Sequence, residues 1–357
     1  MRLAYCPYML HFKQPAGTSR GVLTEKPTYI IKIYDENDPE HFGLGECAVF
    51  PGLSPEADGR YEYKLVEMLA NIALGRGTDL SRYSSLNYGL EMAIRDYAGG
   101  CRHIYWPTEF TEGKSEMTIN GLIWMGSEEE MLARLDEKIK AGFKCVKMKI
   151  GSLDWKKELD IIRSIRSHFP ADQLTIRVDA NGGFVMDNVM PRLAQLADLE
   201  VHSIEQPIPA RNIDLMKFIC DVSPVPVALD EELIGVYDDG MKRHLLEYVQ
   251  PAFIVCKPAL CGGFSGAETW IGIAKELGIG WWITSALESN VGLNALAQFT
   301  AMMTQGTEWA DFAQGLGTGA LYTNNFVTPI RLTGEHMTYD PSAPLDNAQF
   351  ADLDWRC

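Results

Sequence analysis

Residues 145–151, CVKMKIG, form an apolar run that carries two lysines and ends at a glycine. The length and composition of the run are those of a short buried strand. Because side chains alternate along a strand, Lys147 and Lys149 point to one face and the apolar side chains point to the other. Two neighbouring ammonium groups on a buried face repel each other and lose hydration. The stretch therefore predicts carboxylates, or an anionic ligand, facing the two lysines.

Similar strand-like runs recur from residue 115 onward, each followed by a helical pattern, at the spacing of one strand-plus-helix unit. They lie near residues 119, 147, 177, 204, 228, 254, 283 and 312. Repeated units of this kind favour a closed barrel over an open sheet. We therefore expect an α/β fold, a modified (β/α)7β TIM-type barrel with an α+β capping domain.

The chain outside these units predicts the capping domain. Residues 1–114 contain two expected strands, over 3–13 and 28–34, with a Gly-, Ser- and Thr-rich loop between them. Helical patterns follow at 61–74 and 85–97. We expect the limits to be 1–114 for the cap, 115–314 for the barrel, and 315–357 for a tail that returns to pack on the cap.

Composition narrows the function. The net charge is 32 − 48 = −16, which argues against nucleic acid or an anionic membrane as partner. The 46% of apolar residues suffices for a large core. The eight cysteines form no C-x-x-C pair, and the first residues lack a signal-peptide pattern. We expect a cytoplasmic protein that binds a small-molecule carboxylate; the oligomeric state is open.

Charged residues recur at the predicted carboxyl ends of consecutive strands, where the active site of such a barrel lies. Asp179, Glu205 and Asp230 end the third, fourth and fifth strands. Lys257 ends the sixth strand and Ser285 the seventh. Three hard oxygen ligands without histidine or cysteine suit Mg²⁺. The sequence predicts a magnesium site with lysines on both sides.

This arrangement predicts proton chemistry next to a carboxylate. If a substrate carboxylate binds the metal, its α-carbon lies between the second and sixth strands, and a lysine there can remove the α-proton. Lys149 must then be uncharged part of the time, and the Lys147 ammonium and a divalent cation both favour that form. Taken singly, a K-x-K pair indicates a solvated strand edge, and Asp230 could cap a helix. The recurrence at one structural position favours catalysis.

The ordered motifs KMK (147–149), DAN (179–181), EQP (205–207), DE (230–231) and KP (257–258) resemble the enolase superfamily, in its muconate-lactonizing subgroup. The resemblance covers nearly the whole chain. It implies that Asp179, Glu205 and Asp230 hold Mg²⁺. It also implies that Lys149 is the acid/base, Lys257 the lysine on the opposite face, and Lys147 a companion that reaches a substrate carboxylate.

Within the superfamily, TSALESNVG (284–292) and CKPALCGG (256–263) resemble the o-succinylbenzoate synthases. These lyases dehydrate 2-succinyl-6-hydroxy-2,4-cyclohexadiene-1-carboxylate in menaquinone biosynthesis. The resemblance implies a substrate site. Its expected members are Ser285, Ser289, Gly263, Asn181 and Arg20, the last in the expected mobile loop.

Other functions stay open at this point. N-succinylamino acid racemases and muconate cycloisomerases share the two-lysine arrangement. Dipeptide epimerases also resemble the chain, but they usually carry a D-x-D pair where this sequence has DFAQGLGTG (311–319). Mandelate-racemase-like members place a histidine near the position of Ser285. A non-catalytic barrel scaffold would have little reason to keep so many buried charges.

Overall fold

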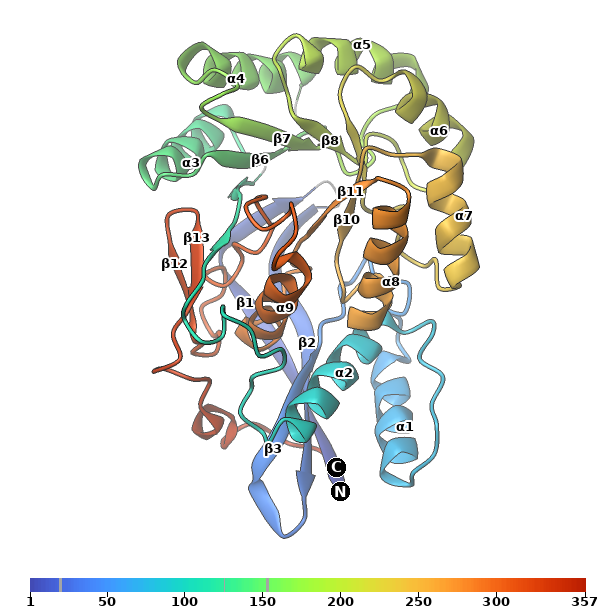
Figure 1. The fold of residues 1–357 in the computed structure, drawn as a ribbon, viewed down its shortest axis with the longest axis vertical. Coiled ribbons are helices and arrows are strands. Elements are labelled where there is room, and N and C mark those ends of the chain that lie inside the picture. Colours follow the sequence, from blue (N-terminus) through green and yellow to red (C-terminus); the bar gives the residue numbers. More distant parts are fainter. Residues whose placement is uncertain (19–20, 125, 152–153) are drawn as a thin grey trace.

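A parallel sheet carries the short apolar runs of the middle of the chain, and a helix follows each of its strands (Figure 1). The computed structural model describes residues 1–18, 21–124, 126–151 and 154–357. Within these ranges, seven strands pair in chain order. They are β5 (Gly121–Ile123), β6 (Cys145–Lys149), β7 (Thr175–Asp179), β8 (Ser203–Glu205), β9 (Val227–Leu229), β10 (Phe253–Cys256) and β11 (Gly280–Ile283). The helices that follow them are α3 (Glu128–Lys140), α4 (Trp155–His168), α5 (Met186–Ala197), α6 (Ile213–Val222), α7 (Asp239–Val249), α8 (Gly263–Glu276) and α9 (Asn290–Thr304).

Two residues close this sheet into a barrel. Gln314 forms a parallel bridge with Ile119, and Gly315 forms one with Thr284. The closing strand is thus much shorter than the one expected near residue 312. The predicted fold class, a modified (β/α)7β barrel with a cap, is confirmed.

The expected eighth strand is short because its aromatic residues pack instead of pairing. Residues 309–312 form a turn. The Phe312 ring centroid lies 6.0 Å from that of Trp282 and 4.3 Å from the guanidinium carbon of Arg177. The Trp309 ring lies 5.7 Å from Trp281. Phe312 therefore packs inside the barrel on Trp282 and Arg177, whereas Trp309 packs on Trp281, which points to the other face of β11.

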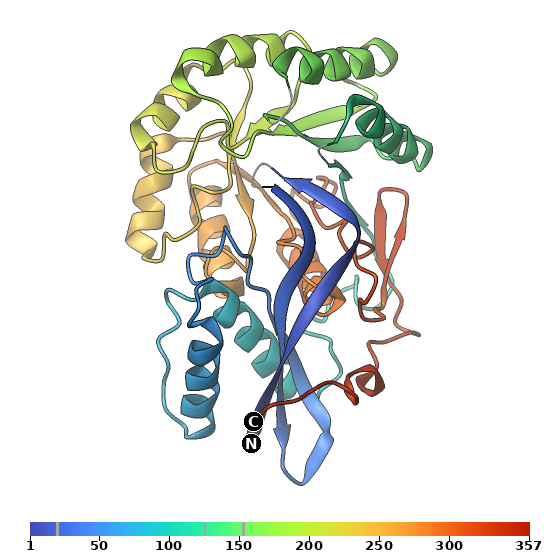
Figure 2. The ribbon, with the colours of Figure 1, turned by 180° about the vertical axis from the view of Figure 1, so that it is seen from behind.

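An antiparallel sheet and two helices form the cap, on the opposite side of the molecule from α4 and α5 (Figure 2). Its strands are β1 (Arg2–Thr18), β2 (Gly21–Asp35) and β3 (Asp38–Cys47), and its helices are α1 (Tyr61–Ala73) and α2 (Ser84–Ala98). Helix α2 lies so close to β3 that a Cβ atom on Gly45 would come within 2.1 Å of the Gly89 carbonyl oxygen. Glycine at both positions allows this contact.

The expected loop between the first two strands was wrong over most of its length. Ala16 pairs with Leu23 and Gly17 pairs with Val22, so β1 and β2 continue as one long hairpin. A register shift between His11 and Ala16 accommodates the irregular sequence there. Composition indicated a loop, but pairing with the facing strand satisfies the backbone groups and overrides that preference.

The tail contacts both the barrel and the cap. Strands β12 (Ile330–Thr333) and β13 (His336–Tyr339) form a sheet with β4 (Met117–Thr118), and a short helix η1 (Asn347–Phe350) follows. Arg356 pairs with Tyr5 through backbone hydrogen bonds of 2.9 and 2.8 Å, which places the two termini side by side (Figure 1). The domain limits at residues 114 and 314 stay a prediction.

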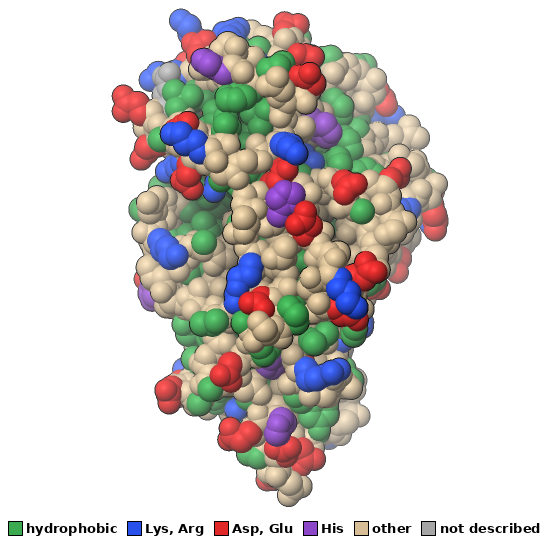
Figure 3. All heavy atoms as spheres, turned by 60° about the vertical axis from the view of Figure 1, so that its left-hand side comes forward, with side chains coloured by type: hydrophobic (Ala, Val, Ile, Leu, Met, Phe, Trp, Pro, Cys, Tyr) green, Lys and Arg blue, Asp and Glu red, His purple; other side chains and the backbone are tan. Residues whose placement is uncertain are grey.

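The surface of the described residues shows mixed charge on the face drawn in Figure 3, where lysine and arginine side chains lie among aspartate and glutamate. In the described part of the chain, no helix combines the length and the apolar composition needed to cross a membrane.

Candidate functional site

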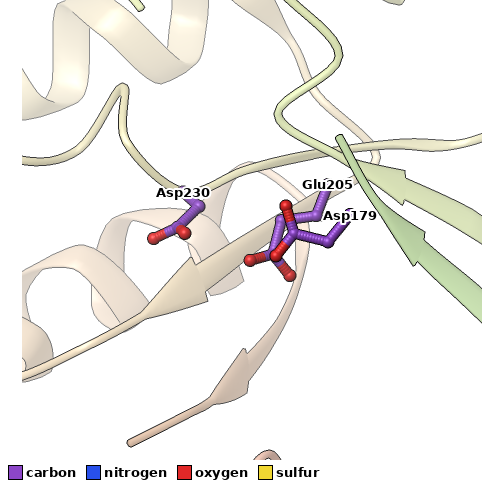
Figure 4. Close-up of side chains that lie close together, drawn as sticks. All are labelled: Asp179, Glu205 and Asp230. Carbon is purple, nitrogen blue, oxygen red and sulfur yellow. The ribbon is translucent and has the colours of Figure 1, made fainter. Parts of the chain in front are cut away.

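Three carboxylates converge at the carboxyl ends of neighbouring strands (Figure 4). Asp179 ends β7, Glu205 ends β8, and Asp230 directly follows β9. Each offers an oxygen atom that lies within 4.8 Å of the oxygen atoms of the other two. All three side chains are buried. The register aligns Asp179 with Glu205, so the strand pairing itself brings the first two acids together.

Three lysines surround these acids. Lys147 Nζ lies 2.5 Å from Glu205 Oε2 and 3.0 Å from Asp179 Oδ2. Lys149 Nζ lies 2.5 Å from Asp179 Oδ2, and Lys257 pairs with Asp230 from the other side. The lysine pair and Lys257 therefore flank the acids, as the strand pattern predicted.

The close packing of charges shifts several pKa values. Burial alone would raise the pKa of Asp179, but the Lys147 and Lys149 ammonium groups outweigh it and hold that pKa well below its usual range. Burial, and then repulsion from Asp179, raise the pKa of Glu205 well above its usual value. Burial would lower the pKa of Lys257, yet Asp230 and Glu205 together raise it. Opposite shifts in adjacent carboxyl groups are typical of functional sites.

One buried oxygen of this cluster lacks a partner. Glu205 Oε1 accepts no hydrogen bond from any described residue. A buried carboxylate oxygen left in this way is costly unless a cation or solvent meets it. Together with the all-oxygen donor set, this atom makes the cluster fit a hard divalent cation.

A cavity of about 230 Å³ opens beside the lysines. Lys147, Lys149 and Lys257 line it, and so do the predicted residues Asn181 and Ser285. The cap contributes part of the wall. Its lining residues are Leu23, Phe50, Pro51, Gly52 and Leu53. The site thus lies between the cap and the barrel, which is where small-molecule sites are commonly found.

Ser289, which was predicted to bind substrate, is not among the residues that line the cavity, and that role stays a prediction. Ser289 is fully buried and is the N-cap of α9. Its Oγ donates to Glu46 Oε2 at 2.6 Å, and its backbone N–H donates to Glu46 Oε1 at 2.9 Å. Gly292 N–H also donates to Glu46, at 2.8 Å. A carboxylate from the cap therefore already occupies this helix N-terminus.

Gly263 likewise lies outside the cavity. Its N–H donates to the Pro258 carbonyl at 2.9 Å. A Cβ atom at Gly263 would meet Asn87 and Glu91 of the cap. Glu91 Oε2 accepts from the Phe264 N–H at 2.6 Å, so this N-terminus is also filled by a cap carboxylate. Arg20, the remaining candidate, lies outside the described residues.

The sequence interpretation missed part of the cavity. Asn120, Leu122 and Trp124, next to or within β5, line it, and so do Thr284 and Thr318. The first three alternate along TINGLIW, a period of two that could have shown which side chains face the barrel interior. Thr318 lies beyond the closing strand, where no periodic signal exists.

The family described as "Enolase C-terminal domain-like" matches residues 130–343. The o-succinylbenzoate synthase of Desulfotalea psychrophila is 40% identical over 94% of this chain and 98% of its own length. The crystal structure of MenC from that organism superposes with a TM-score of 0.81, at 36% identity, over 95% of this chain and 99% of that one.

A protein of much lower sequence identity shares the fold. A dipeptide epimerase from Enterococcus faecalis, complexed with Mg and the dipeptide L-Leu-L-Tyr, has a TM-score of 0.79 at 16% identity and covers 97% of this chain and 98% of its own. Both the family match and the 40% identical relative agree with the geometry described above. This chain belongs to the enolase superfamily.

Proposed function

We propose that this chain is an o-succinylbenzoate synthase. The reaction would convert 2-succinyl-6-hydroxy-2,4-cyclohexadiene-1-carboxylate into o-succinylbenzoate and water, in the cytoplasm, as a step of menaquinone biosynthesis. The observation that carries the proposal is the 40% identity, over 94% of the chain, to the Desulfotalea synthase. The buried acids flanked by lysines support the same reaction class independently of that relative.

Asp179, Glu205 and Asp230 would hold Mg²⁺. Their oxygen-only donor set and the unpartnered Glu205 Oε1 support this assignment. When bound, the ion supplies positive charge that stabilises negative charge developing on a substrate carboxylate.

Lys149 would be the acid/base. It lines the cavity, and Asn181 Oδ1 accepts from its Nζ at 2.9 Å, which fixes the direction of the side chain. Lys149 would take the proton from the ring carbon that bears the carboxylate. The carbon–oxygen bond to the hydroxyl then breaks, the electron pair completes the aromatic ring, and Lys149 returns the proton so that water leaves.

Lys257 and Lys147 would stay charged. Burial lowers the pKa of both lysines, but the neighbouring carboxylates outweigh it, chiefly Asp230 for Lys257 and Asp179 for Lys147. Both pKa values are therefore raised, and both groups are ammonium at neutral pH. Their positive charge would attract the substrate carboxylate and stabilise the negative charge that forms after proton removal. Lys257 does this from the side opposite Lys149.

The test is an assay of the purified protein with the cyclohexadiene substrate, beside a panel of N-succinylamino acids and dipeptides. We expect turnover of the cyclohexadiene, loss of activity in EDTA, and recovery on adding Mg²⁺. Turnover of only the racemase or epimerase substrates would overturn the proposal in favour of those activities. Binding without turnover of any substrate, unaffected by EDTA, would indicate a scaffold.

A further inference from the structure

The cavity has a second side, away from the acids. The acids follow the third, fourth and fifth strands of the barrel, so the facing wall comes from β5, β11 and the closing residues 314–315. This wall contributes Asn120, Leu122, Thr284 and Thr318 to the lining. A substrate with one carboxylate at the acids would extend its remaining atoms toward this wall.

Most polar side chains of the cavity already have partners. Asn181 Oδ1 accepts a hydrogen bond from Lys149 Nζ, and Asn181 Nδ2 donates one to Glu231 Oε1 at 3.0 Å. The Thr284 hydroxyl donates to the Gly315 carbonyl at 2.9 Å. The Thr318 hydroxyl donates to Ser285 Oγ at 2.8 Å.

Ser285 is also fully engaged. Its hydroxyl donates to Glu288 Oε2 at 2.5 Å and accepts from the Leu287 N–H at 2.9 Å, besides the bond from Thr318. The serine thus holds the loop after β11 in shape. The prediction that it binds substrate through its hydroxyl would require one of these bonds to break.

Asn120 differs from these residues. Its side chain is 4% exposed and lines the cavity. Oδ1 has no hydrogen-bond partner within the described chain. The contact from Nδ2 to the Gly121 carbonyl is long, at 3.4 Å. Nδ2 carries two hydrogens and makes only this one long bond within the described chain, so it has a hydrogen left to donate. A buried amide with incomplete hydrogen bonding destabilises a fold, which favours a ligand that completes its hydrogen bonds.

We infer that Asn120 binds the succinyl arm of the substrate and so determines specificity at the end remote from the acids; this rests on the proposed function. The ring carboxylate would be held at the acids, and the departing hydroxyl must face Lys149. The remaining polar atoms are the ketone and the terminal carboxylate of the arm, which are acceptors only. Asn120 would donate to them from Nδ2.

The experiment measures binding of product analogues in the presence of Mg²⁺ by isothermal titration. The probes are o-succinylbenzoate, 2-butanoylbenzoate, which keeps the ketone but lacks the terminal carboxylate, and benzoate, which lacks the arm. Asn120→Ala should weaken binding of o-succinylbenzoate about tenfold, as expected for one lost hydrogen bond, and leave benzoate unchanged. A loss shared with 2-butanoylbenzoate assigns the contact to the ketone, and a loss confined to o-succinylbenzoate assigns it to the carboxylate.

Asn120→Asp sharpens the test, because it keeps the shape of the side chain but removes the donor and adds a negative charge. It should weaken o-succinylbenzoate more than Asn120→Ala does. Asn37→Ala, in an exposed turn between β2 and β3, is the control and should match the wild type. If Asn120→Ala does not fold, Asn120→Ser carries the same comparison.

Equal weakening of benzoate and o-succinylbenzoate would overturn the inference, since Asn120 would then act through the whole site. Unchanged binding of o-succinylbenzoate would overturn it as well. Neither result bears on the proposed function, which is decided separately by turnover of the cyclohexadiene by the wild-type protein.

Discussion

Two groups of carboxylates inside this molecule, one buried and one buried or half-buried, meet very different partners. The strand-end acids, Asp179, Glu205 and Asp230, face lysine ammonium groups, and Glu205 keeps an oxygen without a partner in the described chain. The cap acids, Glu46 and Glu91, accept from backbone N–H groups and hydroxyls at the N-termini of α9 and α8.

This difference in hydrogen-bond partners distinguishes a ligand site, formed by the strand-end acids, from a structural contact, formed by the cap acids. The Glu46 carboxylate accepts at both oxygens, from Ser289, Gly292 and Thr28, so it has little capacity left for another partner. A helix N-terminus also favours a negative charge through its dipole. The strand-end acids combine three negative charges with incomplete hydrogen bonding. Charge and satisfaction must therefore be considered together when a buried carboxylate is assigned a role.

The largest expected effect comes from the lysine that faces the strand-end acids and the cavity. Lys149→Ala should lower turnover by about a thousandfold, because a general base contributes in that range. Metal affinity and the temperature of unfolding should stay near wild type. Lys144→Ala is the matched control from the start of the same region, since that side chain is 81% exposed. Near-normal turnover in Lys149→Ala would remove the proposed base.

Next in size is the loss of one strand-end acid. Asp230→Asn should weaken Mg²⁺ binding at least about tenfold, because a neutral amide oxygen replaces a charged ligand. Isothermal titration measures this directly. Asp221→Asn, on the exposed part of α6, serves as the control. Wild-type affinity in Asp230→Asn would mean that these acids are no more open to a cation than the cap acids are.

The cap acids should affect stability instead. Glu46→Ala removes the acceptor of buried donors and should lower the free energy of unfolding by about 3 kcal/mol, measured in urea. Glu91→Ala should cost about 1 kcal/mol, because that side chain is only half-buried. Mg²⁺ affinity of the folded variants should stay within about twofold of wild type. A large loss of Mg²⁺ affinity with unchanged stability would mean that the cap acids, like the strand-end acids, bind the cation.

The last effect, which is absent at neutral pH, concerns His202, a ring near the amino-terminal end of the barrel. Burial, and then the charge of Arg177, lower its pKa from 6.5 to about 4. The unfolded chain therefore binds a proton below pH 6.5 that the folded chain takes up only near pH 4. Stability should fall as pH drops through this window and level off below it.

Unfolding measured at several pH values tests this. His202→Gln should flatten the dependence between pH 6.5 and 4, whereas His244→Gln, at an exposed position, should not. An unchanged dependence of stability on pH in His202→Gln would show that burial does not lower the pKa of this histidine.

The periodic part of the chain was predictable, and the rest was not. A period of two and a repeated strand–helix unit place Lys149, Asp179 and Glu205 at the carboxyl ends of strands, because strands of one parallel sheet end at the same edge. The roles given to these residues stay predictions. The contact of Ser289 with Glu46 could not be predicted, because Glu46 lies 243 residues away in the chain and no local pattern reports such a contact.

Two predictions about the fold were wrong, both for reasons of packing or pairing. The end of the hairpin formed by β1 and β2 has the composition of a loop, but backbone pairing of Ala16 with Leu23 overrides it. The closing strand shortens to 314–315 because Trp309 and Phe312 pack on Trp281 and Trp282. Packing demands of this kind depend on neighbours that the local sequence does not specify.

The pairing of Tyr5 with Arg356 has a consequence for the synthesis of the protein. The first strand leaves the ribosome long before Arg356 exists, and the cavity wall formed by Leu23 and Phe50 gains its last facing residue only at Thr318. Such distant contacts slow folding. The amino-terminal hairpin therefore completes its contacts only after the whole barrel has been synthesised.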